Sequence, residues 1–386
     1  MFTSKEKQSV LSTVLNTPAR SPIMIMGVVG SGRETIFDAV TTRILSRLGG
    51  TSTERALLVE TSNRWVSGGK LSSRNVLVLS LDDPRGVYWD VSKDLVDSIV
   101  RTRFVDAVVG SMPDTESLTQ NERRAGSELL LAAIDLCYRG RASWTWQDLA
   151  LTVADMPLSE IGSQYVVDAL AGKRAVESTM AAFATSFTAR RTASAFQFSL
   201  RDWYRFPAPA LLGGRSPGSG QSLKNKSALV IPAGRLHGAM SVCLLYAVTE
   251  VLNGAAWHSE QGKTWLVVDD VLETFVPLDL GLIRSTGRHN VQVVLSCRDL
   301  SQIQALYGPE ERASLASEAT FVVARCNDPI TKDTFCAQRL VPETTLAMLG
   351  AKPDGVLCGS FAKTPTGYTS EVVEYPCVDT SVLVGA

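Results

Sequence analysis

The sequence predicts an α/β protein with a parallel sheet and an all-helical insertion. The first observation is a strand, a glycine-rich turn and a helix in succession near the N-terminus. The second is a set of short apolar, β-branched runs that alternate with helical stretches before and after the middle of the chain. The third is residues 91–190, where helical patterns dominate and convincing strand runs are absent. Alternating strands and helices indicate a parallel sheet covered by helices.

The N-terminal unit starts with the apolar run Ile23–Met26, which meets a turn that contains Gly27, Gly30 and Gly32. The next segment carries apolar residues three and four positions apart, which predicts a helix that Gly49 ends. These apolar residues are Phe37, Val40, Ile44 and Leu48. Two further strands are expected, at Ala56–Glu60 and Val76–Leu81.

The middle and the second half of the chain set the domain prediction. Helices are expected over Leu129–Cys137, Trp146–Val153 and Ala169–Phe187. Later strands are expected at Ala228–Pro232, Trp265–Asp269, Val291–Ser296 and Thr320–Arg325. The polar, glycine-rich segment Gly213–Ser227 predicts a loop. We therefore predict an α/β domain formed by residues 1–90 and 191–386, with an all-α domain inserted at 91–190.

Composition narrows the class of protein. With 45% hydrophobic and 20% charged residues, the chain is typical of a folded globular protein. The formal net charge of −1 gives no overall basic field, although a ring-shaped motor can still bind DNA through a locally basic lumen. Seven cysteines without a CxxC pair and three histidines argue against a zinc site and favour reduced, buried thiols. The longest apolar stretches run to about ten residues where a membrane span needs about twenty, so we expect a cytoplasmic protein without a transmembrane segment.

The segment Gly27–Glu34 aligns with the phosphate-binding pattern GxxxxGK[ST]. In that pattern, backbone N–H groups and a helix N-terminus hold phosphates, lysine reaches the outer ones and the hydroxyl binds magnesium. The glycines and Ser31 fit, but Arg33 stands at the lysine position and Glu34 at the hydroxyl position, with Thr35 one place later. Arginine keeps the charge with a bulkier fork, and a glutamate could ligate the metal or repel the nucleotide. The alternative interpretation is a glycine-rich turn without a ligand.

A second motif, Thr264–Asp270, is an apolar strand that ends in two carboxylates. In P-loop ATPases such a strand lies beside the phosphate loop, its first acid supports magnesium and its second polarises the attacking water. The alternative is a strand end that meets solvent. Because about 235 residues separate the two motifs, one core requires an insertion, and the helical region supplies it.

Several segments resemble the conjugative coupling proteins of type IV secretion, the TraD type above all. Asn290–Gly308, NVQVVLSCRDLSQIQALYG, resembles a strand followed by QLxxxYG in that family. GVVGSGRE resembles its phosphate loop, and WLVVDDVLETF resembles its acidic strand. Leu79–Leu95 and Phe198–Arg205, with its RDW, resemble two further family segments that carry fold features. The resemblance runs in order from about residue 20 to 340.

The resemblance implies a RecA-like P-loop domain with an inserted all-helical domain, and a ring-forming ATPase, commonly hexameric, that binds ATP and Mg²⁺. It implies delivery of DNA, a relaxase–DNA complex or protein substrates to a type IV secretion channel. Family members usually begin with a membrane anchor. Without one here, we expect a free cytosolic version, a truncation or a subunit that a partner recruits to the inner membrane.

The resemblance also assigns site roles, and most of them fall on altered residues. Asp269 takes the magnesium-supporting position and Asp270 the catalytic glutamate position, one methylene shorter. Arg298 takes the place of a glutamine that senses the γ-phosphate, and Arg288 takes the place of an arginine offered across the subunit boundary. A displaced water can cost about 100-fold in rate, so efficient hydrolysis is an open question.

Three functions remain open from the sequence. The first is a coupling-protein-like ATPase, with weakened catalysis if the altered site cannot compensate. The second is a catalytically degenerate structural subunit of the secretion or conjugation machinery. The third is a packaging or segregation motor of the wider HerA–FtsK lineage. The segments QIQALYG and RDWYR favour the coupling proteins over this third function.

Overall fold

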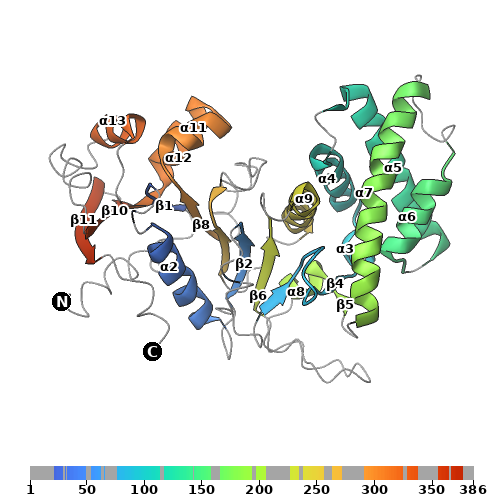
Figure 1. Cartoon of the computed structure of the whole chain (residues 1–386), viewed down its shortest axis with the longest axis horizontal. Helices are drawn as coiled ribbons and strands as arrows, with labels where there is room; N and C mark the ends of the chain where they lie inside the picture. Colours follow the sequence, from blue (N-terminus) through green and yellow to red (C-terminus); the bar gives the residue numbers. More distant parts are fainter. Residues whose placement is uncertain are drawn as a thin grey trace. The chain divides into compact units, whose positions relative to one another are not determined.

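The computed structural model shows an α/β chain that forms two compact units (Figure 1). Unit 1 comprises residues 1–58 and 262–386, and unit 2 comprises residues 59–261. The structure describes residues 21–28, 31, 33–48, 54–61, 65, 76–113, 117–141, 143–157, 166–193, 197–205, 227–233, 238–255, 263–271, 291–324, 328–337, 355–364 and 367–376. The expected loop at Gly213–Ser227 lies outside these residues except for Ser227, as do Gly49 and Arg325.

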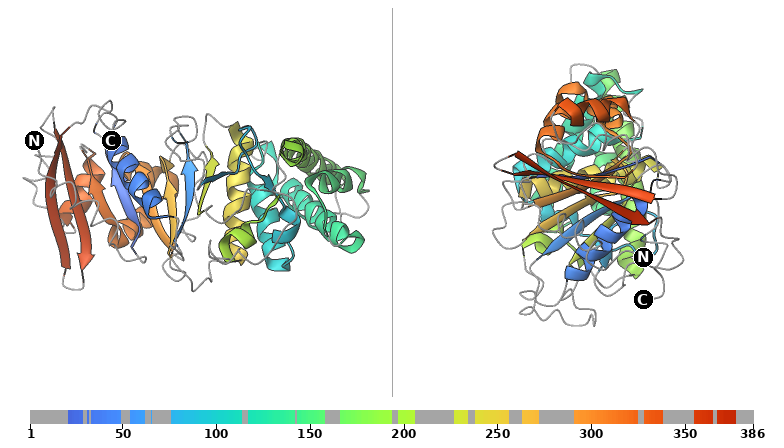
Figure 2. Two further views of the ribbon diagram at one scale, coloured as in Figure 1. Left: turned by 90° about the horizontal axis from the view of Figure 1, so that it is seen from below. Right: turned by 90° about the vertical axis from the view of Figure 1, so that its left-hand side faces the viewer.

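Unit 1 is a sheet with helices on both sides. Its strands are β1 (Ile23–Met26), β7 (Thr264–Val268), β8 (Val291–Cys297), β9 (Thr320–Val323), β10 (Gly355–Thr364), β11 (Gly367–Pro376) and the first part of β2 (Arg55–Glu60). Its helices are α2 (Arg33–Arg47), α11 (Leu300–Tyr307), α12 (Pro309–Glu318) and α13 (Pro329–Ala337). Figure 2 shows α2 on one side of the strands and α11 to α13 on the other.

The strand order in unit 1 is β11-β10-β9-β1-β8-β7-β2. β1 pairs in parallel with both β8 and β9, and β7 pairs in parallel with β8. All residues of these four strands are buried, which is what a parallel sheet covered on both faces requires. The parallel sheet, β1, α2, β2 and the three later strands confirm the predicted α/β pattern.

The acidic strand β7 and the strand that leads into the glycine-rich loop are not neighbours, because β8 lies between β1 and β7. The sequence did not predict this strand order. Two strand spacings of about 4.8 Å separate them, a distance that long side chains can bridge. The sequence also did not predict the antiparallel hairpin β10–β11 at one edge of unit 1, which Figure 2 shows as two long strands.

Unit 2 combines two short parallel strand pairs with a group of helices. Its strands are β3 (Val76–Val78), β4 (Tyr88–Trp89), β5 (Gln197–Phe198) and β6 (Ala228–Pro232). Its helices are α3 (Val91–Asp94), α4 (Ser98–Ser111), α5 (Gln120–Gly140), α6 (Trp146–Asp155), α7 (Val166–Ala193), α8 (Leu200–Arg205) and α9 (Gly238–Ala255). β3 pairs with β6 and β4 with β5, both in parallel. The helices expected from periodicity within residues 91–190 are confirmed as α5, α6 and α7.

The helices of unit 2 pack around an aromatic cluster. Trp146 stacks on Phe187 at a centroid distance of 5.1 Å and meets Phe183 edge-on at 5.1 Å. Its indole Nε1 donates a 2.8 Å hydrogen bond to the Trp89 carbonyl oxygen. Trp89, Trp146 and the two phenylalanines are all buried. The cluster therefore joins α6 and α7 to β4, which stands at the entry to the helical region.

The buried carboxylate of Asp94 ties the entry of the helical region to its exit. One oxygen accepts hydrogen bonds from Ser199 Oγ at 2.8 Å and Arg201 N at 2.8 Å. The other accepts from Trp89 Nε1 at 2.6 Å and Leu200 N at 2.9 Å. The carboxylate thus satisfies two free backbone N–H groups at the start of α8, which any helix leaves without intrahelical partners. Leu79–Leu95 and Phe198–Arg205, two segments that the sequence singled out, meet at this residue.

Helices α5 and α7 approach closely at two glycines. A Cβ atom on Gly172 would lie 2.3 Å from the Glu122 carbonyl oxygen and 2.9 Å from Gly126 N. We predict that Gly172→Ala destabilises the protein by about 1–3 kcal/mol because α7 must move away from backbone atoms. Denaturant unfolding measures this loss. Gly110→Ala in α4 is the matched control, because a Cβ there meets open space and alanine is the better helix former by up to about 1 kcal/mol. Equal effects of the two substitutions would contradict the close approach.

Asp94 gives the protein a pH-dependent component of stability. Burial raises the pKa of Asp94 to about 6, although its hydrogen bonds act in the opposite direction. The unfolded chain titrates near pKa 3.9, so the folded form holds the proton more tightly between about pH 4 and 6. The stability from this group is full below about pH 4 and falls by about 3 kcal/mol as the pH rises through 6.

We predict that Asp94→Asn lowers the free energy of unfolding at every pH, because the amide nitrogen would face N–H donors. The deficit relative to the unsubstituted protein should shrink between pH 4 and pH 6.5 and then stay constant. Urea titrations over this pH range measure both quantities. A deficit that grows with pH would contradict the raised pKa.

Candidate functional site

The glycine-rich loop follows β1 at the carboxyl edge of the unit 1 sheet. Gly27 N donates to the Cys297 carbonyl oxygen at 3.3 Å, and Ser31 N donates to the Val28 carbonyl oxygen at 3.0 Å, which closes a tight turn. A Cβ atom on Gly27 would lie 2.4 Å from Ser31 Oγ and 2.8 Å from Ala324 Cβ. Only glycine fits this position without a shift of its neighbours. Gly30 and Gly32, also predicted loop residues, lie outside the described residues.

Parallel pairing brings the other predicted site residues to the same edge. Asp269 and Asp270 follow the end of β7, and Arg298 follows the end of β8. The carboxyl ends of parallel strands meet at one edge of a sheet, which is where α/β proteins place their ligands. The sequence-predicted residues thus gather where a nucleotide site is expected.

Arg33 forms the centre of an ion cluster at this edge. Its Nη2 lies 2.9 Å from Glu34 Oε1 and 3.2 Å from Asp270 Oδ2. The Arg33 side chain is only 7% exposed, against 36% for Glu34 and 23% for Asp270. We call these three residues the loop ion cluster. It links the altered lysine, hydroxyl and glutamate positions of the family pattern, although Arg33 and Asp270 are far apart in sequence.

The backbone at Asp270 adopts a left-handed conformation, with φ of 49°. Among the described residues no other non-glycine residue has a positive φ. Aspartate tolerates this conformation better than most residues, but at a cost of about 1–3 kcal/mol. Such strain persists where the surroundings hold it and often marks a functional site.

Arg33 also carries an unsatisfied donor. Its Nε is buried and makes no hydrogen bond to any described residue. A buried N–H without an acceptor costs about 1–3 kcal/mol, and an anion at this position would satisfy it. Arginine bound to phosphate through its fork is a common arrangement, so the donors present here fit a phosphate group.

The remaining predicted residues differ in how the structure places them. Ser31 is buried, and its Oγ accepts a weak 3.4 Å hydrogen bond from Arg33 N. Asp269 is 3% exposed, and Thr35 lies half-buried in the first turn of α2. Arg298 forms an ion pair with Asp299 at 2.9 Å, an interaction the sequence did not predict. Arg288 lies outside the described residues.

The described residues contain no group of three histidine, cysteine or acidic side chains arranged to hold a metal ion. Magnesium at phosphate sites needs only one or two carboxylates, because phosphate oxygens and water complete its shell. Asp269, predicted to support the metal, has the ligand chemistry that this arrangement requires. Its role as a metal ligand stays a prediction.

The comparison with protein-family models decides the family. Residues 13–340 match the type IV secretion-system coupling protein DNA-binding domain. The chain belongs to this coupling-protein family. The resemblance read from the sequence is thereby confirmed, since the match covers most of the chain.

Solved structures of coupling proteins share the fold. The plasmid coupling protein TrwB in complex with the non-hydrolysable GTP analogue GDPNP aligns with a TM-score of 0.58 and 17% identity, over 95% of this chain and 80% of that one. TrwB in complex with ADP and Mg²⁺ aligns with a TM-score of 0.55 and 16% identity, over 92% and 78%. VirB4 of Thermoanaerobacter pseudethanolicus aligns with a TM-score of 0.55 and 12% identity, over 94% and 90%. No curated protein matches the chain. These likenesses confirm the RecA-like α/β fold with a helical domain.

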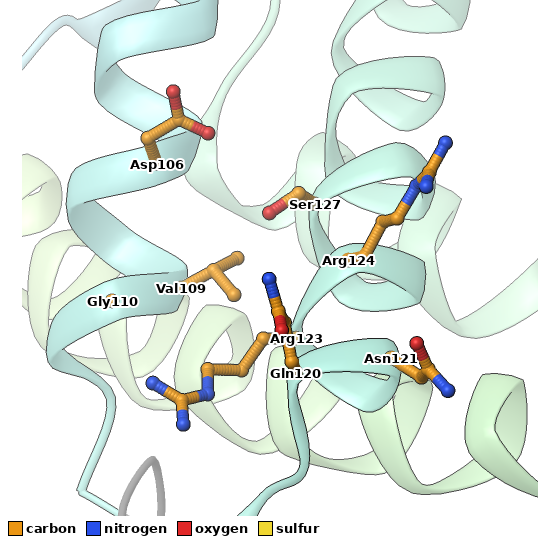
Figure 3. Close-up of a pocket in the computed structure, with 8 residues that line it drawn as sticks. All are labelled: Asp106, Val109, Gly110, Gln120, Asn121, Arg123, Arg124 and Ser127. Carbon is orange, nitrogen blue, oxygen red and sulfur yellow. The ribbon is translucent and has the colours of Figure 1, made fainter.

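A pocket of about 580 Å³ lies in unit 2 between α4 and α5 of the coupling-protein fold. Figure 3 shows its lining: Asp106, Val109, Gly110, Gln120, Asn121, Arg123, Arg124 and Ser127. The Arg123 side chain extends toward α4, whereas Arg124 points to the other side of α5, where it pairs with Glu128 at 3.1 Å. Desolvation raises the pKa of Asp106. The sequence did not predict this pocket, because its residues show no motif.

Among the described residues, no helix of this coupling-family chain combines the length and the apolar character that crossing a bilayer demands. Cys137, Cys243 and Cys297 are buried free thiols, and burial raises the pKa of Cys243 to about 12.

We predict energetic coupling across the loop ion cluster. A double-mutant cycle of Arg33→Met and Asp270→Asn should give a coupling energy of about 1 kcal/mol, because Asp270 is part-exposed and solvent weakens the pair. Asparagine keeps the tolerance for a positive φ, so the cycle isolates the charge. Unfolding in urea measures the four variants. Effects that add within about 0.3 kcal/mol would show that the pair contributes nothing to stability.

Proposed function

We propose that this chain is an ATP-binding coupling-protein subunit that delivers DNA, or a protein substrate, to a type IV secretion or conjugation channel. Family membership supports the coupling role. The observation that carries the nucleotide part is the buried, unsatisfied Nε of Arg33 in the turn that follows β1. The TrwB structures with ADP and Mg²⁺ and with a non-hydrolysable ATP analogue concern a protein of the same fold.

The roles of the site residues follow from their positions. Arg33 would hold phosphate oxygens with its free donor, and backbone N–H groups at the start of α2 would add to this binding. Asp269 would support Mg²⁺, which supplies charge neutralisation at the phosphates when bound. Asp270 would orient water at the position of the family's glutamate. Arg298 remains the proposed sensor of the γ-phosphate, and Arg288 the proposed arginine that would stabilise the transferring charge across a subunit boundary.

The helical region is the proposed site of substrate contact, and its α4–α5 pocket offers suitable groups. Arg123, Gln120 and Asn121 supply donors of the kind that bind nucleic-acid phosphates without reading sequence. We place the inserted all-α domain at 91–190, within unit 2. Homo-oligomerisation, up to a hexamer, contact with a relaxase–DNA complex and recruitment to the inner membrane by a partner belong to the same proposal.

A second function has an observation in its favour. The loop ion cluster pairs Arg33 with the protein's own carboxylates, as expected of a subunit that keeps the fold for assembly and has lost turnover. Glu34 stands where a neutral hydroxyl is the family's magnesium ligand, and this change weakens the case for efficient hydrolysis. The alternative is therefore a catalytically degenerate structural subunit of the same machinery.

Steady-state ATP hydrolysis by the purified chain, with and without single-stranded DNA, tests the proposal. We expect turnover that DNA stimulates and that Asp269→Ala lowers by at least about 100-fold, because the magnesium support is lost. Asp97→Ala is the control, since it also removes a carboxylate but one that caps α4 in unit 2 and belongs to no proposed site. Turnover no higher than that of Asp269→Ala would favour the assembly subunit.

A further inference from the structure

The loop ion cluster has an unusual charge for a phosphate site. One guanidinium is in contact with two carboxylates, Glu34 and Asp270, at 2.9 and 3.2 Å. The three side chains therefore sum to a formal charge of −1, whereas the lysine, hydroxyl residue and glutamate that the family pattern has at these positions sum to 0. Arg33 is buried and the two carboxylates are part-exposed, at 36% for Glu34 and 23% for Asp270, so water screens these charges only in part.

This charge matters for a nucleotide because a triphosphate is itself strongly negative. A phosphate that reaches Arg33 must come within a few ångström of both carboxylates, since all of them contact the same guanidinium. Like charges at such distances in a partly buried site lower affinity on the order of 10- to 100-fold each. Glu34 and Asp270, which hold Arg33 in place, thus repel a metal-free nucleotide.

A divalent cation reverses this effect. Carboxylate oxygens and phosphate oxygens are the ligands that Mg²⁺ prefers, so Glu34 and Asp270 become favourable neighbours of a nucleotide that carries the ion. Arginine suits this arrangement better than lysine, because its five N–H donors let Nη2 stay with the carboxylates while Nε meets a phosphate. Arg33 Nε is buried and makes no hydrogen bond to the described residues, as is also the case for Nε of Arg101, Arg190 and Arg312.

We propose that Glu34 and Asp270 restrict this site to the magnesium complex of the nucleotide and exclude the metal-free form. The two carboxylates are selectivity residues for the ligand's charge state. This inference rests on the proposed nucleotide binding and states which form of the nucleotide enters. It also gives a common reason for the altered lysine and hydroxyl positions of the loop.

Equilibrium binding of a fluorescent ATP analogue, with Mg²⁺ or with EDTA, tests the inference without any need for turnover. For the unsubstituted chain we expect a Kd at least about 100-fold higher in EDTA than with Mg²⁺. Glu34→Gln should lower this ratio of the two Kd values by about tenfold, because removal of one repulsive charge tightens binding in EDTA. Asp270→Asn should do the same. Glu34 lies on the surface of α2, so its neutralisation leaves the fold intact, which thermal melting confirms.

Asp38→Asn is the matched control. Asp38 lies one helical turn further along α2 and outside the loop ion cluster, so its neutralisation should leave the ratio unchanged. An equal narrowing in this control would overturn the inference and point to a general charge effect.

The outcomes separate the inference from the proposal beneath it. Binding that is equally tight with Mg²⁺ and with EDTA would overturn the selectivity while nucleotide binding stands. An unchanged ratio in both Glu34→Gln and Asp270→Asn would also overturn it. Binding in neither condition would overturn the proposed nucleotide binding and this inference together.

Discussion

The carboxylate of Asp94 is the interaction on which the helical part of this protein depends. Its two oxygens accept four hydrogen bonds, one from Trp89 at the entry to the helical region and three from residues 199–201 at its exit. The parallel pairing of β4 with β5 brings the same two segments together. An insertion whose ends meet at one point can be accommodated in another domain without stretching it. The four donors offset part of the energetic cost of burying this carboxylate, and the remainder raises its pKa.

In the loop ion cluster, as at Asp94, a buried charged group is held by partners that compensate its burial. A buried guanidinium needs acceptors, and Glu34 and Asp270 supply them. The arginine, the glutamate and the shortened acid therefore form one set of linked substitutions and need not be read as separate losses. The chain holds a cation at the lysine position by placing acids where the family has a hydroxyl and a longer acid. Neutralising either carboxylate would still leave Arg33 one acidic partner, whereas replacing Arg33 would remove the cation that both carboxylates contact.

The sequence predicted those features that local periodicity encodes. The apolar run Ile23–Met26, the helical spacing after it and the amphipathic pattern of α5 each specify an element on their own. Strand order depends on pairing between distant segments, so the position of β8 between β1 and β7 was missed. The β10–β11 hairpin did carry a local signal, the β-branched and aromatic residues of Gly367–Pro376, and it was overlooked.

The sequence predicted which residues belong to the candidate site but not which of them contact one another. Alignment to the family pattern named Arg33, Glu34 and Asp270, but nothing in the sequence indicates that they contact one another, because 237 positions separate Arg33 from Asp270. The pairing of Arg298 with Asp299 was likewise hidden, since the resemblance assigned Arg298 to a phosphate. Contacts between charged side chains depend on rotamers and on the sheet order, and neither follows from local pattern.

The cost of this site argues for a ligand. Arg33 Nε is buried without an acceptor among the described residues, and Asp270 adopts a strained left-handed conformation. Each feature costs about 1–3 kcal/mol, a large share of the stability of a typical domain. A subunit kept only for assembly gains nothing from either cost, because an apolar residue at position 33 would remove the need for both acids. Backbone strain and an unsatisfied donor at the carboxyl edge of a parallel sheet are features that a binding site retains. These two energetic costs therefore favour a nucleotide-binding subunit over a purely structural one.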